Sequence, residues 1–156
     1  MIDIDQFKEY VIDPTLETLG LYSVAASELL LGTAIQESRL TYLKQLGGGP
    51  ALGVFQMEPA THDDLWENYL KYHGDLAALV EDLTHRGWQA TARDMIRNLA
   101  YAVAMCRVHY LRVPEALPDA GDIEGHARYY KQYYNTPLGK ATEEQYLENW
   151  EKSHED

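Results

Sequence analysis

The spacing of apolar residues along the chain predicts a mainly helical fold. Apolar residues recur three or four positions apart between residues 23 and 41, and Ser23 stands where a helix N-cap is expected. The stretch from Trp88 to Arg112 has the same period, which is typical of a helix that packs on a core. Further helices are expected at residues 5–12 and 61–72. Another should start at Asp13-Pro14, with Asp13 as the cap and Pro14 in the first turn, and a last one should span residues 142–150 with Thr142 as the cap.

Residues 47–59 interrupt this helical pattern. Gly47-Gly48-Gly49-Pro50 cannot continue a helix and predicts a flexible turn. Gly53-Val54-Phe55-Gln56-Met57 is expected to be a short β-type segment that stops at Pro59. The pattern therefore predicts a mainly α fold with a small β-type part.

Length, composition and charge narrow the classes of protein. A chain of 156 residues without a linker-like run of Pro, Ser or charge is expected to form one domain, residues 1–156. The net charge of −12 argues against a nucleic-acid partner, since such proteins generally present a basic face. The single Cys106 cannot form an internal disulfide. The first residues resemble no signal peptide and no stretch has the ~18 apolar residues of a membrane span, so no membrane insertion is expected.

The position of Glu37 is unusual for a carboxyl group. Leu30, Thr33 and Ala34 lie on the same helical face as Glu37, and this face is expected to pack against the core. Burial of an unpaired carboxylate raises its pKa, which gives the proton-holding group that a general acid requires. The alternative is a solvated or ion-paired residue, with Arg39 near in sequence.

Glu37-Ser38 is followed, after the glycine-rich loop, by Gly53-Val54-Phe55-Gln56 and then, two residues later, by Pro59-Ala60-Thr61. This order resembles the soluble lytic transglycosylase branch of the lysozyme-like superfamily. In that family a catalytic Glu-Ser pair precedes Gly-Leu-Met-Gln, two further residues and Pro-Ala-Thr. Val54 and Phe55 replace the Leu and Met of the family pattern, a conservative change.

A later stretch is similar to a second motif of the same family, Ala-Tyr-Asn-Ala-Gly-x-Gly. The corresponding residues here are 133–139, in which Tyr134, Asn135 and Gly139 match, whereas Tyr133 and Pro137 depart from the pattern. In the family the Tyr lies close to the catalytic Glu and the Asn lines the cleft. The alternative for Tyr134 is an aromatic residue that packs on the core.

The resemblance implies a lysozyme-like α+β fold and a muramidase that acts on the glycan strand of peptidoglycan without a metal or other cofactor. Glu37 would act as acid and then as base, and Ser38 would orient it or the substrate's acetyl group. Gln56 would bind substrate, with Tyr134 and Asn135 supporting the glutamate and the sugar. The three histidines His62, His73 and His85 have no metal-ligand spacing.

Three alternatives remain open at the level of sequence. Glu58 could serve as a second carboxylate of a hydrolytic lysozyme, or could interact with the start of the following helix. Trp66 could be a platform for a sugar ring or a core residue. The acidic charge and the N-terminus also fit a structural or binding domain of a phage virion, in which other virion proteins would be partners. The expected location is therefore a phage virion or the host cytoplasm.

Overall fold

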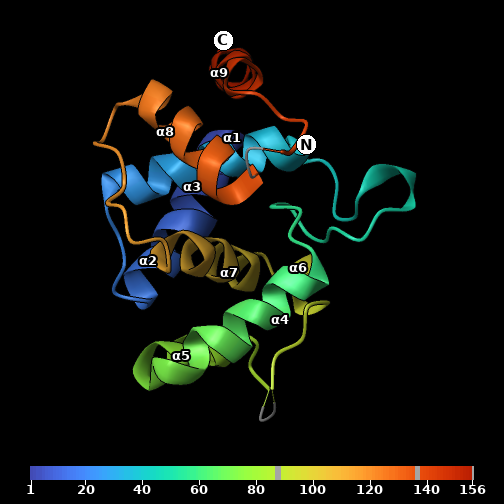
Figure 1. Cartoon of the computed structure of the whole chain (residues 1–156), viewed down its shortest axis with the longest axis vertical. Helices are drawn as coiled ribbons and strands as arrows, with labels where there is room; N and C mark the ends of the chain where they lie inside the picture. The colour runs from blue at the N-terminus through green and yellow to red at the C-terminus, as the bar shows by residue number, and fades with distance from the viewer. Residues whose placement is uncertain (87–88, 136–137, 156) are drawn as a thin grey trace.

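The computed structural model describes residues 1–86, 89–135 and 138–155, and this part of the chain is mainly helical (Figure 1). None of its helices is both long and apolar enough to cross a membrane. The elements are α1 (Ile4–Phe7), the π-helical η1 (Lys8–Ile12), α2 (Asp13–Thr18), α3 (Val24–Ser38), the 3-10 turn η2 (Leu46–Gly48), α4 (Pro59–Asn68), the 3-10 turn η3 (Leu70–Tyr72), α5 (Gly74–Asp82), α6 (Asp94–Arg97), α7 (Leu99–Leu111), α8 (Ile123–Tyr129), the π-helical η4 (Tyr130–Asn135) and α9 (Glu143–Ser153).

Helix α3 is the central element of the fold. It contacts η1, α7, α8 and α9, which surround it in Figure 1. A helix that is apolar on all sides is stable only when it is covered on all sides, and the residues of α3 buried in this way are Ala26, Leu29, Leu30, Leu31, Ala34 and Ile35. The predicted cap is confirmed, because the Ser23 side chain accepts a hydrogen bond from the Ala26 backbone N–H at 3.0 Å.

Helix α9 packs very closely on α3. A Cβ atom added at Gly32 would lie 1.9 Å from the hydroxyl oxygen of Tyr146, so only glycine permits this approach. The predicted cap of α9 is also confirmed: Thr142 and Gln145 form a reciprocal capping box.

The prediction that Asp13 caps a new helix is wrong. The backbone remains helical through Ile12 and Asp13, so α2 continues directly from η1. The Asp13 carboxylate instead accepts hydrogen bonds from the Ser27 hydroxyl of α3 and, at 2.9 Å, from the Lys8 ammonium. Ser27, which tertiary packing brings to Asp13, and Lys8 of the preceding turn have replaced the capping bond.

The core helix predicted between Trp88 and Arg112 is confirmed for residues 99–111, which form α7, but residues 94–97 form the separate helix α6, and Trp88 itself lies outside the described residues. Asn98 has an extended backbone (φ −116°, ψ 100°) that separates α6 from α7. Its side chain accepts from the Tyr101 N–H at 2.9 Å and donates to the Leu83 carbonyl at 2.8 Å. An asparagine with both of these partners starts a new helix rather than continuing the preceding one.

Residues 42–58 form an arm that leaves the helical body after α3 and returns to it before α4 (Figure 1), and its second part packs on the core through Leu52, Val54, Phe55 and Met57. Within the described residues the arm contains isolated bridges, Lys44 with Leu52 and Leu52 with Met57, but no strand. The predicted extended segment is wrong, because residues 53–56 form a tight turn with positive φ at Gly53 (77°) and Gln56 (49°). A Cβ atom added at Gly53 would lie 2.4 Å from the Met95 carbonyl oxygen, so the turn packs closely against α6.

Candidate functional site

A cleft of about 650 Å³ lies between the arm, the C-terminal end of α3, the start of α4, α7 and η4. It brings together segments that are far apart in the sequence, including most of the predicted site residues. Its lining consists of Glu37, Gln45, Leu46, Ala51, Gln56, Met57, Glu58, Thr61, His109, Tyr134, Asn135 and Gly139.

Glu37 is half-buried at the end of α3, on the face that also carries the fully buried Leu30, Thr33 and Ala34. Its Oε2 accepts a hydrogen bond from the hydroxyl of Tyr130 at 2.7 Å. Burial raises the pKa of Glu37 from 4.5 to about 7, and the hydrogen bond from Tyr130 lowers it by a smaller amount. None of the ion pairs between described residues involves Glu37. The carboxyl can therefore hold a proton near neutral pH.

Tyr130 is the partner of Glu37 that the sequence analysis did not select. The predicted Tyr134 lines the cleft, but its hydroxyl donates to the Phe55 carbonyl at 2.6 Å and so supports the turn of the arm. The two tyrosine rings stack with centroids 5.9 Å apart. Tyr130 lies one helical turn before Tyr134, and this spacing was the signal in the sequence that both rings share one face.

Ser38 connects α3 to the arm rather than lining the cleft. Its side chain is 2% exposed, donates to the Val54 carbonyl at 2.6 Å and accepts from the Leu40 N–H at 3.1 Å. These contacts hold residues 53–56 beside the end of the helix that carries Glu37. Ser38 is therefore placed to orient the end of α3 that carries Glu37, which is one of its two predicted roles, and it is not among the residues that line the cleft.

Gln56 and Asn135 are the amide side chains of the cleft that the sequence analysis selected. Gln56 donates through Nε2 to the Gly53 carbonyl at 2.9 Å, so its carbonyl oxygen is left as the group that can accept from a ligand. Asn135 accepts from the Lys131 ammonium at 3.0 Å, and Lys131 also donates to the Gly139 carbonyl at 2.7 Å.

A polar network connects Asn135 to the carboxyl group. Burial and the neighbouring Glu37 raise the pKa of Tyr130 far above its ordinary value, whereas a hydrogen bond with the Asn135 side chain lowers it. Asn135 therefore lies next to the hydroxyl group that donates to Glu37. The residues Thr136 and Pro137 of the same motif lie outside the described residues.

Glu58 is exposed at the cleft and occupies the N-cap position of α4. Its side chain makes no capping hydrogen bond, so any effect on the helix comes from its charge. The cleft therefore contains two carboxyl groups in different environments, one half-buried and one in water.

His109 is a further cleft residue that the sequence analysis did not identify. Its Nε2 donates to the Tyr133 carbonyl at 3.2 Å, and burial lowers its pKa to about 4, so the ring is neutral at pH 7. The ring packs edge-on against Tyr134 with centroids 4.9 Å apart. His109 thus gives this wall of the cleft a neutral polar side chain.

Neither a metal cluster nor a known relative defines this site. The described residues contain no group of three or more His, Cys, Asp or Glu side chains that could hold a metal ion. Comparisons of the chain with protein-family models, with curated proteins and with solved structures found no match. The function is therefore argued from the cleft itself, in which a half-buried, tyrosine-bonded Glu37 faces a space about 650 Å³ in volume.

Proposed function

We propose that this chain is a peptidoglycan-degrading muramidase of the lytic transglycosylase type, with Glu37 as its single catalytic carboxyl group. The observation that carries the proposal is the position of Glu37, half-buried and bonded to Tyr130 in a cleft that also holds Gln56 and Asn135, where burial raises its pKa to about 7. A general acid works best when its pKa lies near the pH of the reaction. The Glu-Ser, Gly-x-x-Gln and Tyr-Asn resemblances support the same assignment.

The proposed reaction uses Glu37 twice. Protonated Glu37 donates its proton to the oxygen of the bond between N-acetylmuramic acid and N-acetylglucosamine, and the bond from that oxygen to the anomeric carbon breaks. The N-acetyl group of the substrate stabilises the positive anomeric carbon. The Glu37 carboxylate then accepts the proton of the C6 hydroxyl, whose oxygen bonds to the anomeric carbon and closes a 1,6-anhydro ring. No water is consumed.

Tyr130 has a definite part in this proposal. Its hydroxyl, 2.7 Å from Glu37 Oε2, stabilises the carboxylate that exists between the two proton transfers. Burial favours the protonated form and the hydrogen bond favours the carboxylate, so the pKa stays near the operating pH. The residue can therefore serve as both acid and base.

A hydrolytic lysozyme is the second candidate, because Glu58 lines the same cleft as Glu37. Hydrolytic glycosidases generally use two carboxyl groups that flank the scissile bond, one as acid and the other as base or nucleophile. In that case Glu58 would activate a water molecule, and the products would carry reducing ends.

We extend the proposal to the fold family of the chain and to its place in a phage virion. The helical arrangement around α3 would be that of the lysozyme-like superfamily, with the arm as a lip over the substrate groove. A phage virion protein that meets the cell wall during entry or lysis would fit the acidic charge of the chain.

Digestion of purified peptidoglycan tests the proposal. Wild type, Glu37→Gln and Glu58→Gln would be compared by mass spectrometry of the soluble fragments, with folding checked by circular dichroism. We expect 1,6-anhydro products from wild type and Glu58→Gln, and none from Glu37→Gln. Reducing ends that disappear with Glu58→Gln would favour the hydrolase, and no release by folded wild type would contradict both enzymatic functions and leave a binding domain.

A further inference from the structure

A second groove, about 880 Å³ in volume, lies on the other side of the arm from the Glu37 cleft. Neighbouring residues of the arm face the two spaces: Gln45 and Ala51 line the cleft, whereas Lys44, Pro50 and Leu52 line the groove. The remaining lining of the groove comes from α4 and from the segment before α6, and consists of Pro59, His62, Asp63, Trp66, Glu67, Gln89, Ala90, Thr91, Ala92 and Arg93.

Trp66 forms part of the wall of this groove and does not line the cleft. Its indole N–H donates to the Tyr101 hydroxyl at 2.8 Å. That hydroxyl lies 2.7 Å from His62 Nε2, and His62 Nδ1 lies 2.9 Å from the Asp63 carboxylate. Because Tyr101 accepts from Trp66, its own proton is directed to His62 Nε2, and His62 donates from Nδ1 to Asp63.

This chain of hydrogen bonds fixes the indole ring. Tyr101 and His62 are buried, and burial lowers the pKa of His62, so the neutral ring required by the chain is the favoured form. The polar edge of Trp66 is thus satisfied inside the protein, while the half-buried side chain still lines the groove. What Trp66 can offer a ligand is a rigid aromatic surface at little entropic cost.

The charges around the ring are balanced. Lys44 and Arg93 carry two positive charges, and Asp63 and Glu67 carry two negative charges, whereas the whole chain has a net charge of −12. A strongly charged ligand would meet as much repulsion as attraction here. A neutral ligand with many hydroxyl and amide groups can hydrogen-bond to both kinds of side chain and stack its apolar C–H face on the indole.

We propose that this groove is a second binding site for a neutral N-acetylated glycan chain, with Trp66 as the stacking platform. The choice of glycan rests on the proposed function, since the substrate would be a polymer of N-acetylated sugars. The site would hold a strand of the cell wall while the Glu37 cleft acts on another part of the polymer. Its role is anchoring, and it would contribute to the digestion of insoluble peptidoglycan and not to the cleavage of short fragments.

The test is binding of an N-acetylglucosamine tetramer to the inactive Glu37→Gln protein, followed by two-dimensional NMR of the backbone amides and of the indole N–H signals. We expect the Trp66 indole signal and the amides of residues 89–93 to shift. In that background Trp66→Ala should weaken the binding to this site at least fivefold. Gln89→Trp provides a second variant, because residue 89 is exposed on the groove and a large ring there should block it without touching the buried chain.

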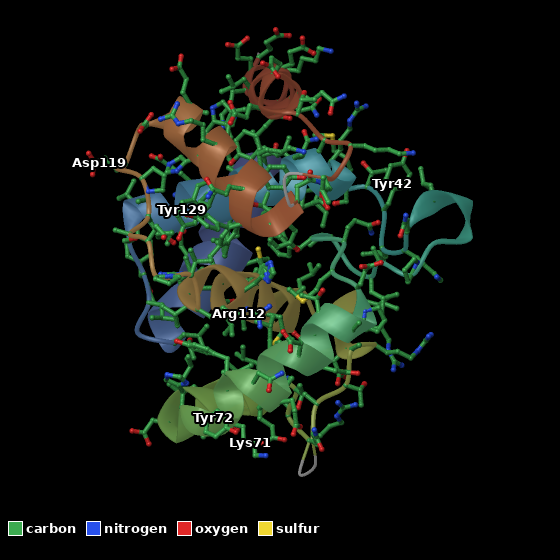
Figure 2. All side chains as sticks on the ribbon, viewed as in Figure 1. Tyr42, Lys71, Tyr72, Arg112, Asp119 and Tyr129 are labelled. Atoms are coloured by element: carbon green, nitrogen blue, oxygen red, sulfur yellow. The ribbon has the colours of Figure 1, made fainter. Side chains whose placement is uncertain are left out.

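Tyr72→Ala is the matched control, since Tyr72 is an aromatic residue of the surface, 71% exposed, and lines neither the groove nor the cleft. Figure 2 labels it on the lower part of the molecule, beside Lys71. The proposal is overturned if the tetramer shifts only signals of the cleft, if both groove variants bind as tightly as the control, or if a free stem peptide shifts the groove signals and the tetramer does not. Because the binding is measured without cleavage, a failure of the proposed activity would be seen separately in the digestion experiment.

Discussion

Replacement of Glu37 by glutamine is expected to stabilise the protein at alkaline pH. Burial raises the pKa of Glu37 from 4.5 to about 7, so the native state binds the proton more tightly than the unfolded chain does. Proton binding by Glu37 therefore stabilises the native state fully when the pH is below the pKa of Glu37 in the unfolded chain. This stabilisation is lost as the pH rises through the pKa of Glu37 in the native state. The two pKa values differ by about 2.5, and at about 1.4 kcal/mol per pKa unit the full loss is about 3 kcal/mol.

Glutamine has the shape of the protonated carboxyl group, keeps an oxygen that can accept from Tyr130 and does not ionise. We therefore expect the stability advantage of Glu37→Gln over wild type to grow by about 2.5 kcal/mol between pH 5 and pH 8. Urea denaturation at the two pH values, followed by far-UV circular dichroism, measures this difference directly. The comparison does not depend on whether the protein is an enzyme.

Glu58→Gln is the control for this experiment, because Glu58 is an exposed carboxyl group of the same cleft. Its effect on the free energy of unfolding should stay within about 0.5 kcal/mol at both pH values. The reasoning is refuted if Glu37→Gln has the same advantage at pH 5 and at pH 8, since Glu37 would then be ionised in the native state at both. A Glu37→Gln protein that is less stable than wild type at pH 8 would contradict it as strongly.

Two further predictions concern neighbours of Glu37. Tyr130→Phe removes a hydrogen bond that stabilises the Glu37 carboxylate by about 1.5–3 kcal/mol, so the pKa of Glu37 should rise. The alkaline limb of the pH–rate profile on peptidoglycan should then move up by at least about one pH unit. A limb that stays in place or moves down would contradict this role of Tyr130. Gly53→Ala places a methyl group 2.4 Å from a backbone carbonyl at a positive φ, so urea denaturation should show a loss of more than about 2 kcal/mol. Gly48→Ala, which has a positive φ but open space around it, should lose only about 1 kcal/mol, and equal losses would show that the contact with α6 is unimportant.

Local sequence patterns were sufficient for much of the helical framework. Ser23 and Thr142 were identified as caps because the capping bond joins residues three apart, and the structure contains both bonds. The burial of the face that carries Glu37 follows from residue spacing alone, since a helix brings every third or fourth residue to one side. The raised pKa of Glu37 is a direct consequence of that burial.

The failures occurred where a tertiary partner replaced a local one. Asp13 has the sequence context of a cap but binds Ser27 and Lys8, and Asn98 breaks an apparently continuous helix because it also binds the carbonyl of Leu83. The turn at Gly53 depends on the close approach of α6, which lies some forty residues further along the chain. No local pattern contains the contacts with Ser27, Leu83 and α6.

The sequence by itself determined that this chain is mainly helical and that its carboxyl at position 37 is held partly out of water. Only the tertiary structure decided that Tyr130, and not Tyr134, donates to that carboxyl, and that Trp66 faces a separate groove. The physical reason is the range of the interactions concerned. Periodicity and capping act over one helical turn, whereas the hydroxyl of Tyr130 reaches a residue 93 positions away, at a place that is set by the packing of α8 against α3 and of η4 against α7.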